Sequence, residues 1–209
     1  MHYLKNLKVL ILSFFLSSYS SGKDKDTWTD FRGPSADGIV ADCPRNLPTK
    51  WSEKENIVWK TEIKGRAWSS PVVWKDQVWV TNSTPDGKSM GAFCINSKNG
   101  DIIYEFKLFE NDEVEPLGNN VNSYGSPSPT IEEGRVYIHF GSYGTVAINT
   151  KTGKIIWKRT DLPCRHLRGP GSSPVLFDEL LILTMDGADV QYLIALDKKT
   201  GKTIWKTDR

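Results

Sequence analysis

The chain has few residues of the kinds that usually carry reactive or metal-binding chemistry. Its 209 residues include three cysteines and three histidines. It has no CxxC pair, no adjacent Cys-Cys pair, no CxxCH haem motif and no Gly-rich phosphate loop. Redox dithiol, zinc-knuckle, haem and nucleotide-loop signatures are therefore missing. Cys43, Cys94 and Cys164 are expected to be small buried or partly buried thiols, although export would permit one disulfide.

The chain also lacks an apolar run that could cross a membrane, which takes about 20 residues. The apolar run at 9–16 is too short, follows Lys5 and Lys8, and precedes a stretch of small residues at 17–22. This order is typical of an export signal. We predict that residues 1–22 are a signal peptide, that the protein is exported to the periplasm or beyond, and that no transmembrane segment remains afterwards.

An excess of charge of one sign is missing as well. Removal of the predicted signal takes away two lysines and leaves 25 basic and 25 acidic residues. A neutral chain lacks the basic surface on which nucleic-acid binding depends. Nucleic acid is therefore not expected as a partner.

What the chain does have is eight tryptophans and a motif that occurs three times. The motif (Asn/Asp)-x-x-(Thr/Asn)-Gly-x-x-x-(Trp/Tyr) spans 96–104, 149–157 and 197–205. Its glycines are 53 and then 48 residues apart, close to the length of a propeller blade. Apolar runs lie on both sides, so each motif predicts two strands joined by a tight Asx-Gly turn, with the aromatic residue placed between packed sheets.

A second signature, Ser-x-Pro or Ser-Pro, precedes each of these hairpins, at 69–73, 126–130 and 172–176. An acidic turn and an apolar strand follow it each time, and proline is tolerated at the start of a strand. Each unit therefore predicts four strands, and repeated four-stranded units predict an all-β fold of the β-propeller class. A sandwich of irregular hairpins is the alternative.

The number of units does not close a ring. Three units are present, and the segment 57–60 resembles the last strand of a unit without its own blade, as in propellers closed by an N-terminal strand. Propellers have about four to eight blades. We therefore expect a fragment of a seven- or eight-bladed propeller, with residues 23–55 as an N-terminal extension and 56–209 as the partial propeller. A half-propeller that self-associates is the alternative.

The three motifs resemble the pyrroloquinoline-quinone-type (PQQ-type) propeller repeat. The segment Trp28-Thr-Asp-Phe-Arg-Gly-Pro34 is similar to the opening of PQQ-binding-like propellers of exported bacterial proteins. The resemblance covers residues 27–209. It implies the fold more strongly than the function, because the family contains both BamB-like scaffold proteins, which bind protein partners, and quinoprotein dehydrogenases, which hold PQQ and Ca²⁺ at the propeller axis.

The residues present favour the scaffold branch. The adjacent cysteines that quinoprotein alcohol dehydrogenases share are missing. Calcium takes about six to eight oxygen ligands, and the acidic residues at 112–115 are better explained as a solvated loop. We therefore predict a non-catalytic protein that binds a protein partner or a small ligand, with no cofactor assigned. PQQ with Ca²⁺ belongs only to the alternative of an N-terminal part of a quinoprotein dehydrogenase, and a glycan-associated accessory propeller is a third possibility.

The candidate binding residues precede the three Ser/Pro signatures. If the first strand of each blade is innermost, these positions lie at one mouth of the channel, where cations, amides and aromatic rings suit an anionic or ring-shaped ligand or a peptide. The alternative is that they cap the blade ends. A nucleophile–base pair of Cys164 and His166 is disfavoured because no third residue orients it, and His139 is expected to be an ordinary strand residue. The channel-rim candidates are Arg66, Trp68, Asn122, Tyr124, His166 and Arg168.

Overall fold

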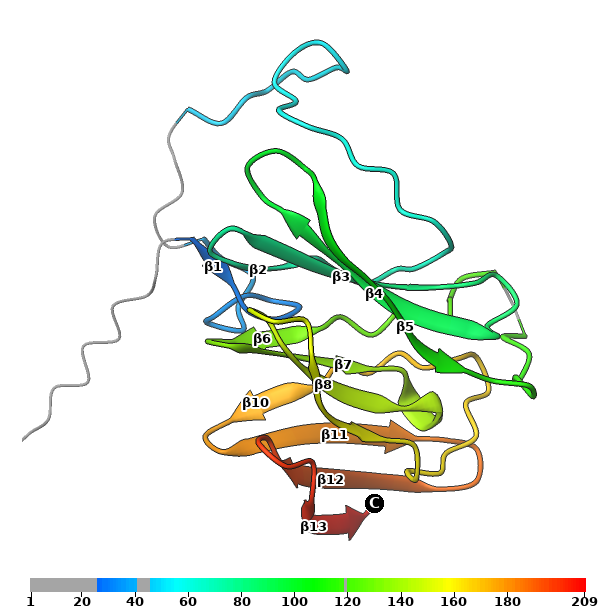
Figure 1. The fold of residues 1–209 in the computed structure, drawn as a ribbon. Coiled ribbons are helices and arrows are strands. Elements are labelled where there is room, and N and C mark those ends of the chain that lie inside the picture. Colours follow the sequence, from blue (N-terminus) through cyan, green and yellow to red (C-terminus); the bar gives the residue numbers. More distant parts are fainter. Residues whose placement is uncertain (1–25, 41–45, 119) are drawn as a thin grey trace, which may run out of the picture.

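The computed structural model describes residues 26–40, 46–118 and 120–209. These residues form one five-stranded and two four-stranded antiparallel sheets, which are stacked in chain order (Figure 1). The predicted signal peptide and Cys43 lie outside the described residues. Within the described ranges, no helix has the length and apolar character needed to span a membrane.

Each sheet is a run of consecutive hairpins, so the predicted four-stranded units are confirmed. One short 3-10 turn, η1 (Gly141–Tyr143), lies in the second unit. The first sheet contains β1 (Thr27–Trp28), β2 (Val72–Trp74), β3 (Gln77–Ser83), β4 (Ser89–Asn96) and β5 (Ile102–Glu110). The second contains β6 (Thr130–Glu132), β7 (Arg135–His139), β8 (Thr145–Asn149) and β9 (Ile155–Arg159). The third contains β10 (Val175–Phe177), β11 (Leu180–Asp186), β12 (Gln191–Asp197) and β13 (Thr203–Asp208).

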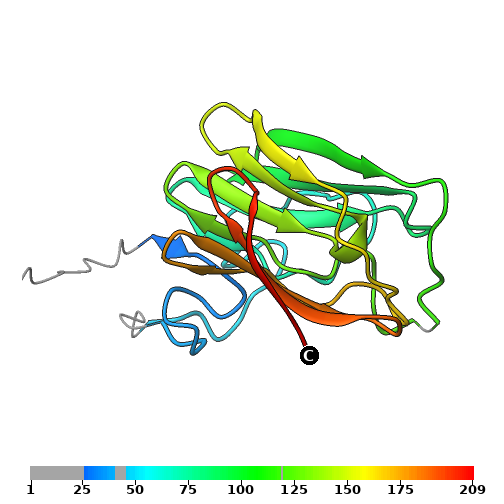
Figure 2. The same cartoon turned by 90° about the horizontal axis from the view of Figure 1, so that it is seen from below.

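The second sheet is buried on both faces because its strands alternate between two apolar cores. Val136 and Ile138 of β7 pack into the core shared with the first sheet. Tyr137, between them, packs into the core shared with the third sheet. Successive side chains of a strand point to opposite faces, so an unbroken apolar strand fills both cores. Figure 2 shows the same stacking of the three sheets from a second direction.

At one edge of the stack, aromatic side chains join each sheet to the turn of the next one. Tyr104 of β5 donates its hydroxyl to the Lys151 carbonyl (3.0 Å), and Trp157 of β9 donates Nε1–H to the Lys198 carbonyl (3.0 Å). Both carbonyls belong to the predicted Asx-Gly turns. Gly153 has a φ of +68°, and a Cβ there would lie 2.9 Å from the Tyr104 ring. The turn glycine is therefore required both by its backbone conformation and by the ring that covers it.

At the opposite edge, the serines of the Ser/Pro signatures link the first strands of all three units. The Ser70 N–H donates to the Ser128 hydroxyl (2.8 Å), and the Ser128 N–H donates to the Ser173 hydroxyl (3.0 Å). Each serine stands directly before the proline of its signature. The signature therefore marks the junction between neighbouring sheets as well as the start of a strand.

The segment at 57–60 lies against the first sheet. Trp59 donates Nε1–H to the Ser97 carbonyl (2.8 Å), and the Thr61 hydroxyl donates to the Gly100 carbonyl (2.5 Å). Trp59 thus holds the same position relative to the first turn as Trp157 holds relative to the third. It has the place of a final strand's aromatic residue, although residues 57–60 are not assigned to a strand.

Strand β1 was not anticipated by the repeat. It pairs with β2, Trp28 opposite Val73. The Thr29 carbonyl then accepts the backbone N–H of Ile131 (2.9 Å) and the hydroxyl of Thr130 (3.2 Å) in the second sheet. The WxxFRGP segment therefore ties the first strands of two neighbouring units together.

The serine link can be tested with two neighbouring substitutions. Ser173→Ala removes the acceptor of the buried Ser128 N–H, and an unpartnered buried donor costs about 1–3 kcal/mol. The exposed Ser172 has no such contact, so Ser172→Ala is expected to change the unfolding free energy by less than about 0.5 kcal/mol. Urea unfolding of both variants measures the difference, and equal stabilities would contradict the proposed link.

Candidate binding rim

Three connecting segments meet at one end of the stacked sheets: 62–69 before the first unit, 111–126 before the second, and 160–173 before the third. The Arg66 guanidinium donates to the Asn120 carbonyl (3.3 Å), and Trp68 Nε1–H donates to the Val121 carbonyl (3.0 Å). Asn122 Nδ2 donates to the Arg168 carbonyl (2.7 Å). The three segments are thus joined to one another by side-chain hydrogen bonds.

This surface carries exposed apolar side chains next to cations. Trp68 is 49% exposed, Val121 75% and Leu167 71%. The Arg66 guanidinium lies 4.7 Å from the centre of the Trp68 ring, within cation–π range. Arg168 is exposed beside Leu167. We call Arg66, Trp68, Val121, Leu167 and Arg168 the rim.

The two arginines of the rim keep their charge available. Within the described ranges, neither the Arg66 nor the Arg168 guanidinium lies within ion-pair distance of a carboxylate. Arg165 differs, because its Nε lies 3.9 Å from Glu115. A partner that brings carboxylates to the rim would therefore meet two cations without displacing an internal ion pair.

Two of the six sequence candidates are buried. Tyr124 is 5% exposed, donates its hydroxyl to the Glu115 carbonyl (2.6 Å) and packs edge-on against Tyr143. A Cβ at Gly87 would collide with its ring. The Tyr124 side chain therefore holds the 111–126 segment against the first and second sheets and does not reach the surface. Asn122 is also engaged, since its Oδ1 accepts the Ser126 hydroxyl.

His166 is the second buried candidate. It is 8% exposed, and its Nε2 accepts the Ser142 N–H (3.1 Å). Because Nε2 is the acceptor, the ring proton lies on Nδ1, which is 3.8 Å from the Cys164 sulfur. Burial lowers the pKa of His166 and raises the pKa of Cys164 to about 11. A nucleophilic cysteine needs a lowered pKa. The buried Cys164 and His166 side chains therefore serve to pack the segment.

A hollow of about 300 Å³ opens beside the rim. Trp68, Val80 and Asn82 are among the residues that line it. Its size suits a single anchoring side chain of a partner or a small ligand. This hollow is a concave part of the surface beside the rim.

Two residues of the rim, Val121 and Leu167, were missed by sequence reasoning. Each is a single aliphatic residue within a polar connecting segment, Asn120-Val121-Asn122 and His166-Leu167-Arg168. An aliphatic residue between polar neighbours in a loop was the available signal. Burial could not be read from the sequence, because it depends on how the segments pack.

No group of three or more His, Cys, Asp or Glu side chains able to hold a metal ion is found in the described part of the chain. Cys94 and Cys164 are both free, buried thiols and belong to different apolar cores. Burial raises the pKa of Cys94 to about 12. Both are packed as small apolar side chains.

Consecutive four-stranded antiparallel sheets, stacked face to face and joined at their first strands, define part of a β-propeller. The family model described as outer membrane protein assembly factor BamB matches residues 43–163, more than half of the chain. The chain therefore belongs to this family of PQQ-type repeat propellers. No curated protein sequence matches the chain.

Two solved dehydrogenase structures show the same fold, and a BamB structure is similar at a lower TM-score. A europium-containing methanol dehydrogenase is 14% identical over 69% of this chain and 25% of its own, with a TM-score of 0.54. The quinohemoprotein alcohol dehydrogenase of Comamonas testosteroni is 18% identical over 69% of this chain and 21% of its own, with a TM-score of 0.51. BamB of Moraxella catarrhalis is 14% identical over 72% of this chain and 38% of its own, with a TM-score of 0.47. The chain thus spans a quarter or less of the two dehydrogenases.

Buried His139 predicts a loss of stability in acid. Its Nδ1 lies 2.8 Å from the Thr145 hydroxyl, and burial lowers its pKa to about 3. The unfolded chain binds a proton near pH 6.5 and the folded chain does not. Stability is therefore complete above about pH 6.5 and falls by up to about 1.4 kcal/mol per pH unit until about pH 3.

Threonine stands at the corresponding position of the other two units, Thr81 and Thr184, so His139→Thr is the matched variant. Between pH 6.5 and 4, the unfolding free energy of this variant should change less steeply with pH than that of the wild type. The difference in slope corresponds to the one proton that His139 takes up on unfolding. Chemical unfolding at a series of pH values measures this slope. Identical slopes in the two proteins would show that His139 does not titrate as its burial requires.

Proposed function

We propose that the chain is a non-catalytic binding module of an exported propeller protein, and that it engages a protein partner through the rim. The observation that supports this most is the rim itself, where exposed Trp68, Val121 and Leu167 lie among arginines that have no carboxylate partner in the described part of the chain. Aromatic residues and arginine are enriched where proteins bind one another. The family's description as an assembly factor points in the same direction.

The rim is preorganised for binding. Its segments are linked by hydrogen bonds from Arg66, Trp68 and Asn122, and Tyr124 fixes the central one from inside. A surface that is already ordered loses less conformational entropy when a partner binds. The side chains that reasoning from the sequence considered for catalysis, Cys164 and His166, are part of this support.

Removal of both rim arginines tests the proposal. The double variant Arg66→Ala, Arg168→Ala is expected to weaken partner binding at least about tenfold, because charged contacts at the centre of an interface are worth more than about 1.4 kcal/mol. The partner is first captured by a photo-crosslinking residue at position 121 or 167, and its affinity is then measured with the purified proteins.

The matched control is Lys151→Ala, Lys202→Ala, which removes two exposed cations from the turns at the other end of the sheets. This control should retain the affinity of the wild type, and both double variants should unfold within about 1 kcal/mol of it. If the control weakens binding as much as the rim variant, the partner binds elsewhere.

A further inference from the structure

The third sheet exposes apolar side chains on the face that points away from the second sheet. Leu176 of β10 packs against the core shared with the second sheet, so its neighbours Val175 and Phe177 point to the opposite face. They are 56% and 61% exposed. Ile182 is paired with Val175, and Trp205, 38% exposed, follows on the same face through the pairing of β11, β12 and β13. We call Val175, Phe177, Ile182 and Trp205 the outer face.

The corresponding side chains of the first two units are buried at a junction between sheets. By its position after the Ser-Pro pair, Val175 corresponds to Val72 and Thr130, which are 0% and 2% exposed. Trp205 corresponds to Trp157, which is 9% exposed and packs into the core between the second and third sheets. The outer face therefore consists of the positions through which this repeat packs on a neighbouring sheet.

Two hydrogen-bond donors that have fixed places in a junction also occur in the third unit. In the second unit, the Ser128 N–H donates to the Ser173 hydroxyl, and Trp157 Nε1–H donates to the Lys198 carbonyl. The Ser173 N–H and Trp205 Nε1–H hold the same two places in the third unit. Neither of them has an acceptor among the described residues. A partner of the outer face must therefore bring a serine hydroxyl and a turn carbonyl, together with apolar side chains.

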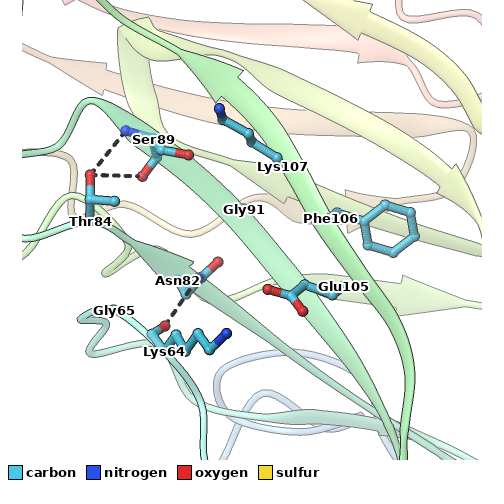
Figure 3. A pocket seen from close by; sticks show the side chains of 9 residues that line it. All are labelled: Lys64, Gly65, Asn82, Thr84, Ser89, Gly91, Glu105, Phe106 and Lys107. Atoms are coloured by element: carbon cyan, nitrogen blue, oxygen red, sulfur yellow. Dashed lines mark hydrogen bonds between the residues drawn. The ribbon is translucent and has the colours of Figure 1, made fainter.

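The first sheet of a second copy does not offer these groups. Its turn carbonyl at Ser97 already accepts Nε1–H of Trp59 from the same chain. Phe106 packs against the core of the first two sheets, so Glu105 and Lys107 beside it point to the other face of the first sheet. That face holds a polar cavity of about 400 Å³ (Figure 3), and it is costly to bury charged side chains under an apolar surface. The charged and amide side chains around this cavity are Lys64, Asn82, Glu105 and Lys107.

We propose that the outer face docks a further four-stranded unit of the same repeat, one in which the turn carbonyl is free. The Ser173 N–H then donates to the serine before the proline of that unit, and Trp205 donates Nε1–H to its turn carbonyl. The Trp205 ring covers the glycine of that turn, as the Trp157 ring covers Gly201 at the preceding junction. In repeat proteins each unit gains stability from the interface with its neighbour. The docking does not depend on the function of the rim, which lies at the ends of the sheets and not on this face.

A fused chain tests the docking directly. A second copy of residues 160–209, which contain the third unit and the segment before it, is attached after Arg209. Exchange of the Trp205 indole N–H with D₂O is followed by NMR in the fused and in the original chain. Docking is expected to slow this exchange at least about tenfold, because a hydrogen-bonded group exchanges only when its junction opens. The same exchange rate in both chains would overturn the proposal, whether or not the attached unit folds.

Two substitutions separate docking from a change within the third unit. Trp205→Phe is expected to lower the urea midpoint of the fused chain by about 0.3 M more than that of the original chain, because the hydrogen bond to the turn carbonyl is lost only where the junction exists. Trp51→Phe, at an exposed tryptophan of the N-terminal segment, is the matched control and should change both midpoints equally. An equal effect of Trp205→Phe on the two chains would contradict the docking.

Sedimentation of the original chain distinguishes a further unit from a second copy. The chain is expected to remain monomeric at the concentrations used for NMR, and the exchange rate of the Trp205 indole N–H should not depend on concentration. A dimer in which this exchange slows as the concentration rises would show that a second copy covers the outer face, and it would overturn the proposal.

Discussion

Two hydrogen bonds at each junction between sheets fix how neighbouring sheets lie against each other, and the rest of the fold depends on that placement. One joins serines of the first strands, Ser70 to Ser128 to Ser173, and the other joins an aromatic residue of the last strand to the next turn. The serines and the aromatic donors come from fixed positions of the repeat, while the acceptor is the third residue of the 149–153 turn, Lys151, and the second residue of the 197–201 turn, Lys198. Apolar contacts alone are non-directional. The polar pairs give the junction its register, and the connecting segments that form the rim start from strands placed in this way.

Much of the fold could be predicted because the repeat carries its own contacts. The turn glycine of each repeat predicted a hairpin, and the aromatic residue after it predicted a packed ring. In the structure the Trp157 ring packs on Gly201, the turn glycine of the next unit. The serine–serine bonds were not predicted, because the residue that accepts each N–H lies in another unit, 58 or 45 positions away. Strand β1 was not predicted either. Its two residues pair once with β2, and no repeated equivalent exists to reveal them.

The site was less predictable than the fold, for a physical reason. Alternation along an extended segment predicted that the side chains of residues 66 and 68 lie on one side of the chain, and likewise those of 122 and 124. Arg66 does contact the Trp68 ring. Tyr124 and His166 turn inward because the connecting segments also pack on Glu115 and on η1. The side of a connecting segment that is buried depends on the segment next to it. The connecting segments differ between the units, so the repeat does not predict which of their side chains are buried. Val121 and Leu167 are exposed for the same reason.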